Sequence, residues 1–420
     1  MSFQQGLSGL NATAKSLEVI GNNIANASTY GAKASRAEFS DVYAAALNGA
    51  GANAIGIGVN LSAVSQQFTQ GNILTTENPM DLAINGAGFF QVTDGNSPVT
   101  FTRNGQFKVD RDGFIVNNQL QKLLGYPASG NGVIQPGAAA PLQLPTSGIN
   151  PQVTGNVLIE MNLDSRLAVT APAAGPAINY ADPATYNNAT SMSVFDDKGQ
   201  DVALTYYFQK SGTDTWNVFV TANGTTVGGT AAAPLPVTTI TFPANGAAPT
   251  APAGPIAMNI PASTNAAGAA TLAIPGVQLD LTNSTQYGSA FGVTNMTQDG
   301  YAPGQLNSIS IESNGIVMAR YSNGQSKPAG QIEVATFRNP QGLQPLGGNA
   351  WGRTFTSGDP VLGTPGNGNL GVLQSGALEE SNVDLTAELV NMITAQRIYQ
   401  ANAQTIKTVD QIMQTLVNMR

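Results

Sequence analysis

The sequence contains no cysteine and no histidine, and only 10% of its 420 residues are charged. Without cysteine the chain can form neither a disulfide framework nor a thiolate metal site, and thiol catalysis is excluded. Without histidine it lacks the commonest general base and the commonest metal ligand. Most routes to catalysis are therefore closed, and we expect no enzymatic activity, no cofactor and no bound metal.

Long apolar runs and basic clusters are missing as well. No uninterrupted apolar stretch reaches the roughly 18 residues that suggest a membrane-spanning helix. With 17 Lys and Arg against 25 Asp and Glu, the chain lacks the basic face that nucleic acid or an anionic membrane requires. The N-terminus shows no basic segment followed by an apolar core and a small-residue cleavage site, which predicts export without a cleaved signal peptide.

The two ends of the chain carry matching helical patterns. Apolar residues recur there at alternating steps of three and four, the spacing that keeps one stripe of a helix facing a partner. We expect these stripes to pack helix against helix between subunits. The predicted packing residues are Phe3, Leu7, Leu10, Leu17 and Ile24 near the N-terminus, and Leu385, Leu389, Met392, Tyr399, Ile406 and Met413 near the C-terminus.

Helices of this length exceed what a small domain can cover. About 25 to 35 residues at about 1.5 Å per residue span roughly 40 to 50 Å. Other copies of the same chain are the simplest cover, although an ordinary hairpin of two helices within one chain fits the same periodicity. Gly21 interrupts the N-terminal stripe, and we expect a close helix approach there.

Between the helical patterns the chain is mainly β-patterned. Asn-Gly and Asp-Gly pairs such as Asn85-Gly86 and Asp94-Gly95 separate short apolar runs and predict hairpins. The runs at 192–195 and 202–208 predict another hairpin, with 216–220 as a third strand. No charged residue occurs between Asp214 and Asp280, which is typical of loops and edge strands in a peripheral domain.

This order predicts a mainly β protein with α-helical termini and nested domains. The terminal helical domain, coiled-coil-like, comprises 1–31 and 382–420, and an extended connector follows at 32–70. A discontinuous middle β domain comprises 71–144 and 301–381, and it encloses an inserted outer β domain at 145–300. Because the termini lie together at one end and the insert at the other, stacked copies would form a tube.

Two pairs of adjacent acids, Glu379-Glu380 and Asp196-Asp197, look superficially like catalytic carboxylates. Neighbouring residues do not face each other on a helix or strand, so these pairs are poor candidates for catalysis. We interpret Glu379-Glu380 as acids that precede a helix, whose start is marked by Ser381 and Asp384 and whose dipole favours negative charge.

Five segments carry family-specific motifs. They are the segment at 22–33 (NNIANASTYGAK), the segments at 81–90 and 102–107, and the segments at 375–384 and 389–403. Together they resemble the family of bacterial flagellar rod, hook and hook-associated axial proteins. The positions that match its two terminal signatures are Asn22, Asn23, Ala25, Asn26, Gly31, Gln396, Arg397, Tyr399 and Asn402.

The resemblance implies a helical polymer of one subunit type, with the terminal helices lining a central export channel and the insert outside. In length and insert the chain is most similar to the members that form the hook, a curved universal joint that transmits torque from rod to filament. The implied partners are other copies of the chain, the distal rod protein, the hook-associated junction protein, the hook cap scaffold protein and the type III export apparatus. The implied location is extracellular, at the hook and basal body.

Two alternatives remain open. The first is a distal rod or other axial subunit, which is similar at both ends but typically shorter. The second belongs to another class, a secreted β-rich carbohydrate-active enzyme that uses carboxylates. Such an enzyme would account for the β-patterned middle of the chain and the missing histidine, but it would not explain the long apolar stripes of the two terminal helices.

Overall fold

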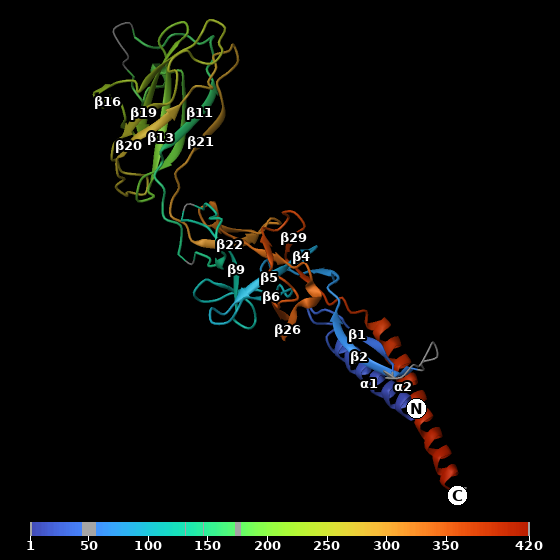
Figure 1. Ribbon diagram of the computed structural model, residues 1–420. Coiled ribbons are helices and arrows are strands. Elements are labelled where there is room, and N and C mark those ends of the chain that lie inside the picture. The colour runs from blue at the N-terminus through green and yellow to red at the C-terminus, as the bar shows by residue number, and fades with distance from the viewer. Residues whose placement is uncertain (1, 44–55, 131, 146, 173–177, 419–420) are drawn as a thin grey trace. The chain divides into compact units, whose positions relative to one another are not determined.

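The computed structural model describes residues 2–43, 56–130, 132–145, 147–172 and 178–418 (Figure 1). The chain divides into two compact units. Unit 1 consists of Met1–Thr146, Ser308–Arg320 and Ser326–Arg420, and unit 2 consists of Ser147–Asn307 and Tyr321–Gln325. Most elements are strands, and the two long helices lie at the termini. The predicted fold class, mainly β with α-helical ends, is confirmed.

The terminal helices of unit 1 run side by side (Figure 1). Helix α1 spans Ser2–Ala25 and helix α2 spans Leu385–Asn418. Asp384 caps α2, because its Oδ1 accepts the N–H groups of Thr386 and Ala387 at 2.9 and 3.1 Å. The helix start predicted at Ser381 is therefore wrong. Within the described residues, no helix is long and apolar enough to cross a membrane.

Helix α2 begins only at Leu385 because Asn382, three residues earlier, is held by hydrogen bonds outside the helix. The Asn382 side chain accepts the N–H of Ala34 at 2.7 Å and donates to the carbonyl oxygen of Gln67 at 2.7 Å. These bonds fix Asn382 against the segments that flank the first two strands. The backbone can turn into a helix only after that point, where Asp384 supplies the cap.

The predicted connector at 32–70 is a β-hairpin where the structure describes it. Strand β1 (Ser35–Tyr43) pairs antiparallel with β2 (Gly56–Gln66), and both strands contact α1. The prediction of a simple extended connector is therefore wrong. These strands are rich in small and polar residues, so they lack the alternation of large apolar residues that marks a strand in sequence. Residues 44–55 of the predicted connector lie outside the described residues.

The remainder of unit 1 is a β domain of short strands. Two of its sheets are pairs: β3 (Ile73–Thr75) with β30 (Ala377–Glu379), and β4 (Leu82–Asn85) with β29 (Val372–Ser375). The largest sheet contains β5 (Phe89–Thr93), β6 (Thr100–Thr102), β7 (Lys108–Val109), β8 (Ile115–Val116), β9 (Lys122–Pro127), β10 (Ala140–Pro141), β22 (Leu306–Ile311), β23 (Ile316–Tyr321), β24 (Ser326–Ile332), β25 (Val334–Thr336), β26 (Gln344–Gly347), β27 (Ala350–Gly352) and β28 (Val361–Gly363).

The largest sheet is built from neighbouring antiparallel hairpins. Its main path runs β22-β23-β24-β9-β5-β6-β27-β26. The pair Asp94-Gly95 lies between β5 and β6, and Asp112-Gly113 lies between β7 and β8, as the sequence predicts. Gly95 and Gly113 have φ angles of 83° and 86°, in the left-handed region that such turns favour. A short 3-10 helix, Pro340–Gly342, precedes β26.

Unit 2 contains two larger sheets. In the first, β19 (Ile256–Ile260), β20 (Ile274–Asp280), β11 (Asn156–Asn162) and β21 (Gly292–Gln298) follow one another in that order. In the second, β12 (Asn188–Phe195), β13 (Asp201–Lys210), β14 (Thr215–Ala222) and β15 (Thr225–Thr226) do so, and β18 (Thr238–Thr241) pairs with β14. The smaller elements are β16 (Gly229–Thr230), β17 (Ala233–Pro234) and a 3-10 helix at Pro183–Thr185.

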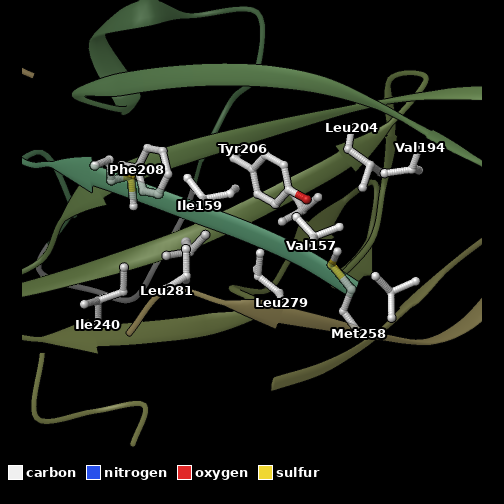
Figure 2. Close-up of a cluster of buried hydrophobic side chains, with 14 of the residues drawn as sticks. Val157, Ile159, Val194, Leu204, Tyr206, Phe208, Ile240, Met258, Leu279 and Leu281 are labelled. Carbon is white, nitrogen blue, oxygen red and sulfur yellow. The ribbon is translucent and has the colours of Figure 1, made fainter. Parts of the chain in front are cut away.

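The two sheets of unit 2 bury one common core (Figure 2). Along β13, Leu204, Tyr206 and Phe208 alternate with less buried residues and point toward β11 and β20. This alternation is what a sheet with one buried face requires. Trp216 is fully buried, and its Nε1 donates to Oε1 of Gln286 at 3.2 Å. The predicted hairpin at 192–208 and the third strand at 216–220 are confirmed.

A core of this kind predicts independent folding. We expect a fragment of residues 147–307 to unfold in a single cooperative thermal transition, measured by circular dichroism, because its buried residues come from its own strands. The control is the same fragment with Val218→Asp, which places a carboxylate in the fully buried core and should abolish the transition. A random-coil spectrum for the unmodified fragment would contradict the domain boundary.

Candidate assembly surface

The terminal helices meet along a seam of small and polar residues. A Cβ atom built on Gly9 would lie 2.9 Å from Nδ2 of Asn402, and one built on Gly6 would lie 3.1 Å from Cγ1 of Ile406. The two glycines therefore allow α1 and α2 to approach closely. The residues of α1 that meet α2, Gly6 and Gly9, each come one position before the apolar residues Leu7 and Leu10, so the contact lies on a neighbouring face of the helix.

The hairpin β1–β2 covers another face of α1 through polar groups. Gln5 Nε2 donates to the carbonyl oxygen of Gly56 at 2.7 Å. The Ser8 hydroxyl donates to the carbonyl oxygen of Val59, and its oxygen accepts the N–H of Val59, both at 2.7 Å. These bonds satisfy backbone groups of an edge strand that would otherwise need solvent. Hydrogen bonds from side chains of α1 to the backbone of β2 thus help to join the helix to the hairpin.

Large apolar side chains lie exposed beside the seam and the hairpin. Phe3 is 49% exposed, Leu389 is 45% exposed and Met413 is 59% exposed. A soluble monomer rarely leaves so many large apolar groups along one element unless another surface covers them. We call these residues the exposed apolar set: Phe3, Leu7, Leu385, Leu389, Val390, Ile393, Ile398, Tyr399, Ile412, Met413 and Val417.

The predicted packing residues fall into three environments. Phe3, Leu7, Leu385, Leu389, Tyr399 and Met413 belong to the exposed apolar set. Leu10, Leu17, Ile24 and Met392 are partly buried. Ile406 contacts Gly6 of its own chain and so belongs to the seam. The close approach expected at Gly21 is wrong: no atom of the described residues lies within 4 Å of a Cβ at that position, and Gly6 and Gly9 supply the approach instead.

Two residues of the N-terminal signature fix the chain at the end of α1. Asn23 is 3% exposed; its Nδ2 donates to the carbonyl oxygen of Ser35 at 2.8 Å, and its Oδ1 accepts the N–H of Ser35 at 2.8 Å. Gly31 has a φ of 70°, and a Cβ there would lie 2.5 Å from the backbone nitrogen of Asn104. The other signature residues lie on α1, α2 or the turn after α1: Asn22, Ala25, Asn26, Gln396, Arg397, Tyr399 and Asn402.

A buried ion cluster joins both helices to the β domain. Glu379 ends β30, and its Oε2 accepts a hydrogen bond from Nη1 of Arg103 at 3.0 Å. Its Oε1 accepts from Nζ of Lys33 and from the N–H of Gly71, the latter at 3.0 Å. The side chains of Lys33 and Glu379 are 0% exposed, and that of Arg103 is 5% exposed. Segments after α1, after β2, after β6 and before α2 therefore meet at one carboxylate.

Burial controls the electrostatics of this cluster. Desolvation lowers the pKa of Lys33, and the Glu379 carboxylate opposes that shift. Desolvation likewise lowers the pKa of Arg103, and the Glu379 carboxylate opposes part of that shift. Arg103 also donates to the carbonyl oxygens of Ile84 and Gly86, at 3.3 and 2.8 Å. One buried carboxylate thus stabilises two buried cations.

The sequence interpretation of Glu379 is wrong. Glu379 lies in a strand and faces the core, whereas Glu380 is partly exposed and accepts a hydrogen bond from Asn72 at 3.0 Å. Glu379 is the last residue of β30, and all three residues of that strand are buried. The proximity of Lys33 and Arg103 to Glu379 depends on the tertiary fold, so the sequence pattern alone does not reveal it.

The second acid pair is also structural. Asp196 is fully buried, and its Oδ1 accepts the N–H groups of Lys198 and Gln200 at 2.9 and 2.8 Å. Its Oδ2 accepts the N–H of Leu272 at 2.7 Å. The carboxylate therefore stabilises the turn between β12 and β13. In the part of the chain that the structure describes, no group of three or more acidic side chains is placed to hold a metal ion.

Four protein-family models match successive parts of the chain. "Flagella basal body rod protein" matches residues 3–33, and "Flagellar hook protein FlgE/F/G D1 domain" matches 83–162. "Flagellar basal body protein FlaE D2 domain" matches 162–301, and "Flagellar basal body rod FlgEFG protein C-terminal" matches 374–419. The first and last of these models cover the two terminal helices.

Full-length relatives show the same relationship. The flagellar hook proteins FlgE of Escherichia coli and Salmonella typhimurium are each 42% identical, over 426 and 425 residues, with 100% of both chains covered. FlgE of Borreliella burgdorferi is 31% identical over 451 residues, covering 100% of this chain and 99% of the relative. The crystal structure of Helicobacter pylori flagellar hook protein FlgE2 has a TM-score of 0.53 at 15% identity, covering 73% of this chain and all of that one, which supports the fold.

The ion cluster yields a stability prediction. Glu379→Gln preserves shape but leaves Lys33 and Arg103 without a counter-ion, so we expect it to lower the free energy of unfolding of unit 1 by about 3–5 kcal/mol. Chemical denaturation followed by Trp351 fluorescence, in a Trp216→Phe background, measures unit 1 alone. The matched control is Glu380→Gln, one residue along, which should cost less than about 1 kcal/mol. Similar small losses in both variants would show that the cluster is not essential.

Proposed function

The chain belongs to the bacterial flagellar hook protein family, and from this premise we propose that its terminal helices are the surface through which copies assemble into the hook. The protein is a structural subunit of the hook. The proposal assigns to inter-subunit packing the predicted residues that its own fold leaves exposed, such as Phe3, Leu7 and Leu389.

The exposed apolar set is the observation that supports this proposal. Helix α2 has 34 residues and α1 has 24, so at about 1.5 Å per residue α2 is the longer by about 15 Å. Gly6, near the start of α1, lies against Ile406, and α2 continues well past that level. Beyond it Ile412, Met413 and Val417 are 54%, 59% and 72% exposed. Neighbouring copies are the natural cover, since a hook contains many of them.

We further propose how the nested domains share the mechanical task. The terminal helical domain (1–31 and 382–420) forms the inner tube around the export channel, because apolar helix packing gives a torsionally stiff wall. The middle β domain (71–144 and 301–381) surrounds it, and the inserted domain (145–300) lies outside. The absence of charge between Asp214 and Asp280 favours contacts that slide during rotation, since few ion pairs fix a single register.

The same reasoning suggests the neighbours at each end of the polymer. The family models for the two terminal segments are shared with basal body rod proteins, which supports helix packing between this chain and the distal rod protein. The hook-associated junction protein, the hook cap scaffold protein and the type III export apparatus complete the proposed partners. The proposed location is the extracellular hook, which the chain would reach through that export apparatus.

Two other assignments receive less support. A carbohydrate-active enzyme would need a pair of carboxylates facing a glycan, whereas one acid of each adjacent pair, Glu379 and Asp196, is buried and stabilises the fold. Hook relatives over the full length also favour a structural role without catalysis. A distal rod subunit would share the terminal helices. Electron microscopy of a deletion strain distinguishes it, because loss of a rod and loss of a hook look different.

A substitution in the exposed apolar set separates assembly from folding. Leu389→Asp places a carboxylate at a proposed contact between subunits, and we expect it to abolish hook formation and motility. The melting temperature of the monomer should change little, because Leu389 is 45% exposed there. Gln404→Glu adds the same charge to an exposed polar position of α2 and should build normal hooks. Electron microscopy counts the hooks, and normal numbers with Leu389→Asp would refute the proposal.

Protease accessibility tests the same surface without mutation. In the free subunit, trypsin should first cut the exposed positions Lys15, Arg397 and Lys407 on the terminal helices and leave the β domains intact. Assembled hooks should resist cleavage at these positions, because neighbouring copies cover them. Gel electrophoresis and mass spectrometry identify the fragments. Terminal helices that resist trypsin in the monomer as well as the β core does would argue against assembly-dependent cover.

A further inference from the structure

A crevice of about 420 Å³ lies between α1, α2 and the hairpin strand β1. Apolar residues such as Ile20 and Ala395 form part of its wall, and polar side chains including Asn23, Gln67 and Glu388 form another part. All three elements belong to unit 1. The crevice is therefore a polar-edged notch beside the exposed apolar set.

The carboxylate in this crevice is only half satisfied. Oε1 of Glu388 accepts a hydrogen bond from Nδ2 of Asn23 at 3.1 Å. Oε2 is shielded from solvent and has no hydrogen-bond partner among the described residues, and neither has Nε2 of Gln67. Arg36 also lines the crevice, but its Nη2 is held by Oε1 of Glu38 at 2.7 Å. A shielded carboxylate oxygen without a donor is unfavourable, so Oε2 of Glu388 is free to accept a hydrogen bond from a group that enters the crevice.

Arg397 is a cation on the same helix with no assigned role in the fold. It is exposed, and it has no ion pair or hydrogen bond from its side chain among the described residues. Its position, nine residues after Glu388, means a rotation of about 900° and a rise of about 13.5 Å along the helix. The two side chains therefore leave opposite faces of α2. Arg397 therefore cannot reach Glu388 of its own chain and points away from the crevice that holds it.

We propose that Arg397 of one copy enters this crevice of the next copy and binds Glu388 there. The guanidinium matches the geometry of a carboxylate, and the broad terminal torsion of Glu388 allows Oε2 to turn toward it. Because donor and acceptor lie on opposite faces of one helix, each copy offers both halves of the contact. Such a head-to-tail contact propagates from copy to copy, as a helical polymer requires. The inference rests on the proposed assembly through the terminal helices.

The absence of cysteine makes a direct crosslinking test possible. The chain with Glu388→Cys and Arg397→Cys, assembled into hooks and treated with a short bismaleimide, should give a ladder of covalent oligomers on a denaturing gel. Each single-cysteine variant should give no ladder beyond dimers. The control Glu388→Cys with Lys407→Cys, another exposed cation of α2, should also give none. A ladder from the Lys407 pair but not from the Arg397 pair would overturn the proposal.

Charge exchange tests the energetics of the contact. Glu388→Arg and Arg397→Glu should each reduce the number of hooks at least about tenfold, because each places like charges together. The chain carrying both changes should recover most of that loss, and all three variants should show the monomer's circular dichroism spectrum. Absence of recovery would overturn the pairing. If Glu388→Arg and Arg397→Glu each built normal hooks while Leu389→Asp built none, the pairing would be refuted and the proposed assembly surface would stand. Normal hooks from Glu388→Arg, Arg397→Glu and Leu389→Asp alike would refute both the pairing and the assembly surface.

Discussion

The buried carboxylate of Glu379 is the constraint on which the arrangement of unit 1 depends. A fully buried charge is tolerated only where counter-ions and donors surround it, and here they come from Lys33, Arg103 and the backbone of Gly71. Lys33 follows the end of α1 and Glu379 precedes the start of α2, so the end of one terminal helix and the start of the other are tied to one fixed point in the β domain. Apolar residues could fill the same volume, but they would not require these particular segments to meet.

The sequence predicts elements well where large side chains mark them and poorly where small ones do. Steps of three and four locate α1 and α2, and Asp-Gly pairs locate the hairpins of the β domain. The hairpin of β1 and β2 escapes prediction because it packs on α1 through backbone and short polar groups. The face of α1 that meets α2 is not predicted either. The apolar pattern points to Leu7 and Leu10, but Gly6 and Gly9 make the contact. Which charges pair with Glu379 is a property of the tertiary fold alone.

The division of labour between the seam and the exposed apolar set has an energetic logic. Gly6, Gly9 and Asn402 allow α1 and α2 to pack together within one chain, so that most large apolar side chains of these helices are left for other contacts. Burying one leucine-sized side chain contributes about 1.5–3 kcal/mol, so four of them per copy would contribute about 6–12 kcal/mol before the entropy of association is subtracted. Under the proposed assembly, a subunit built in this way would gain most of its cohesion when neighbours cover the exposed apolar set.

The chain enters and leaves unit 2 through a narrow two-stranded stem. Ile149 and Gly304 form an antiparallel bridge, and Gln152 and Tyr301 form a second one farther along. The segments by which the chain enters and leaves unit 2 are therefore adjacent, so unit 2 is an inserted domain attached through two neighbouring strands. A replacement domain whose two ends also lie together would meet the same geometric requirement at this stem. For protein engineering, the stem is a graft site at which an epitope or a small enzyme would be repeated once per subunit along the polymer.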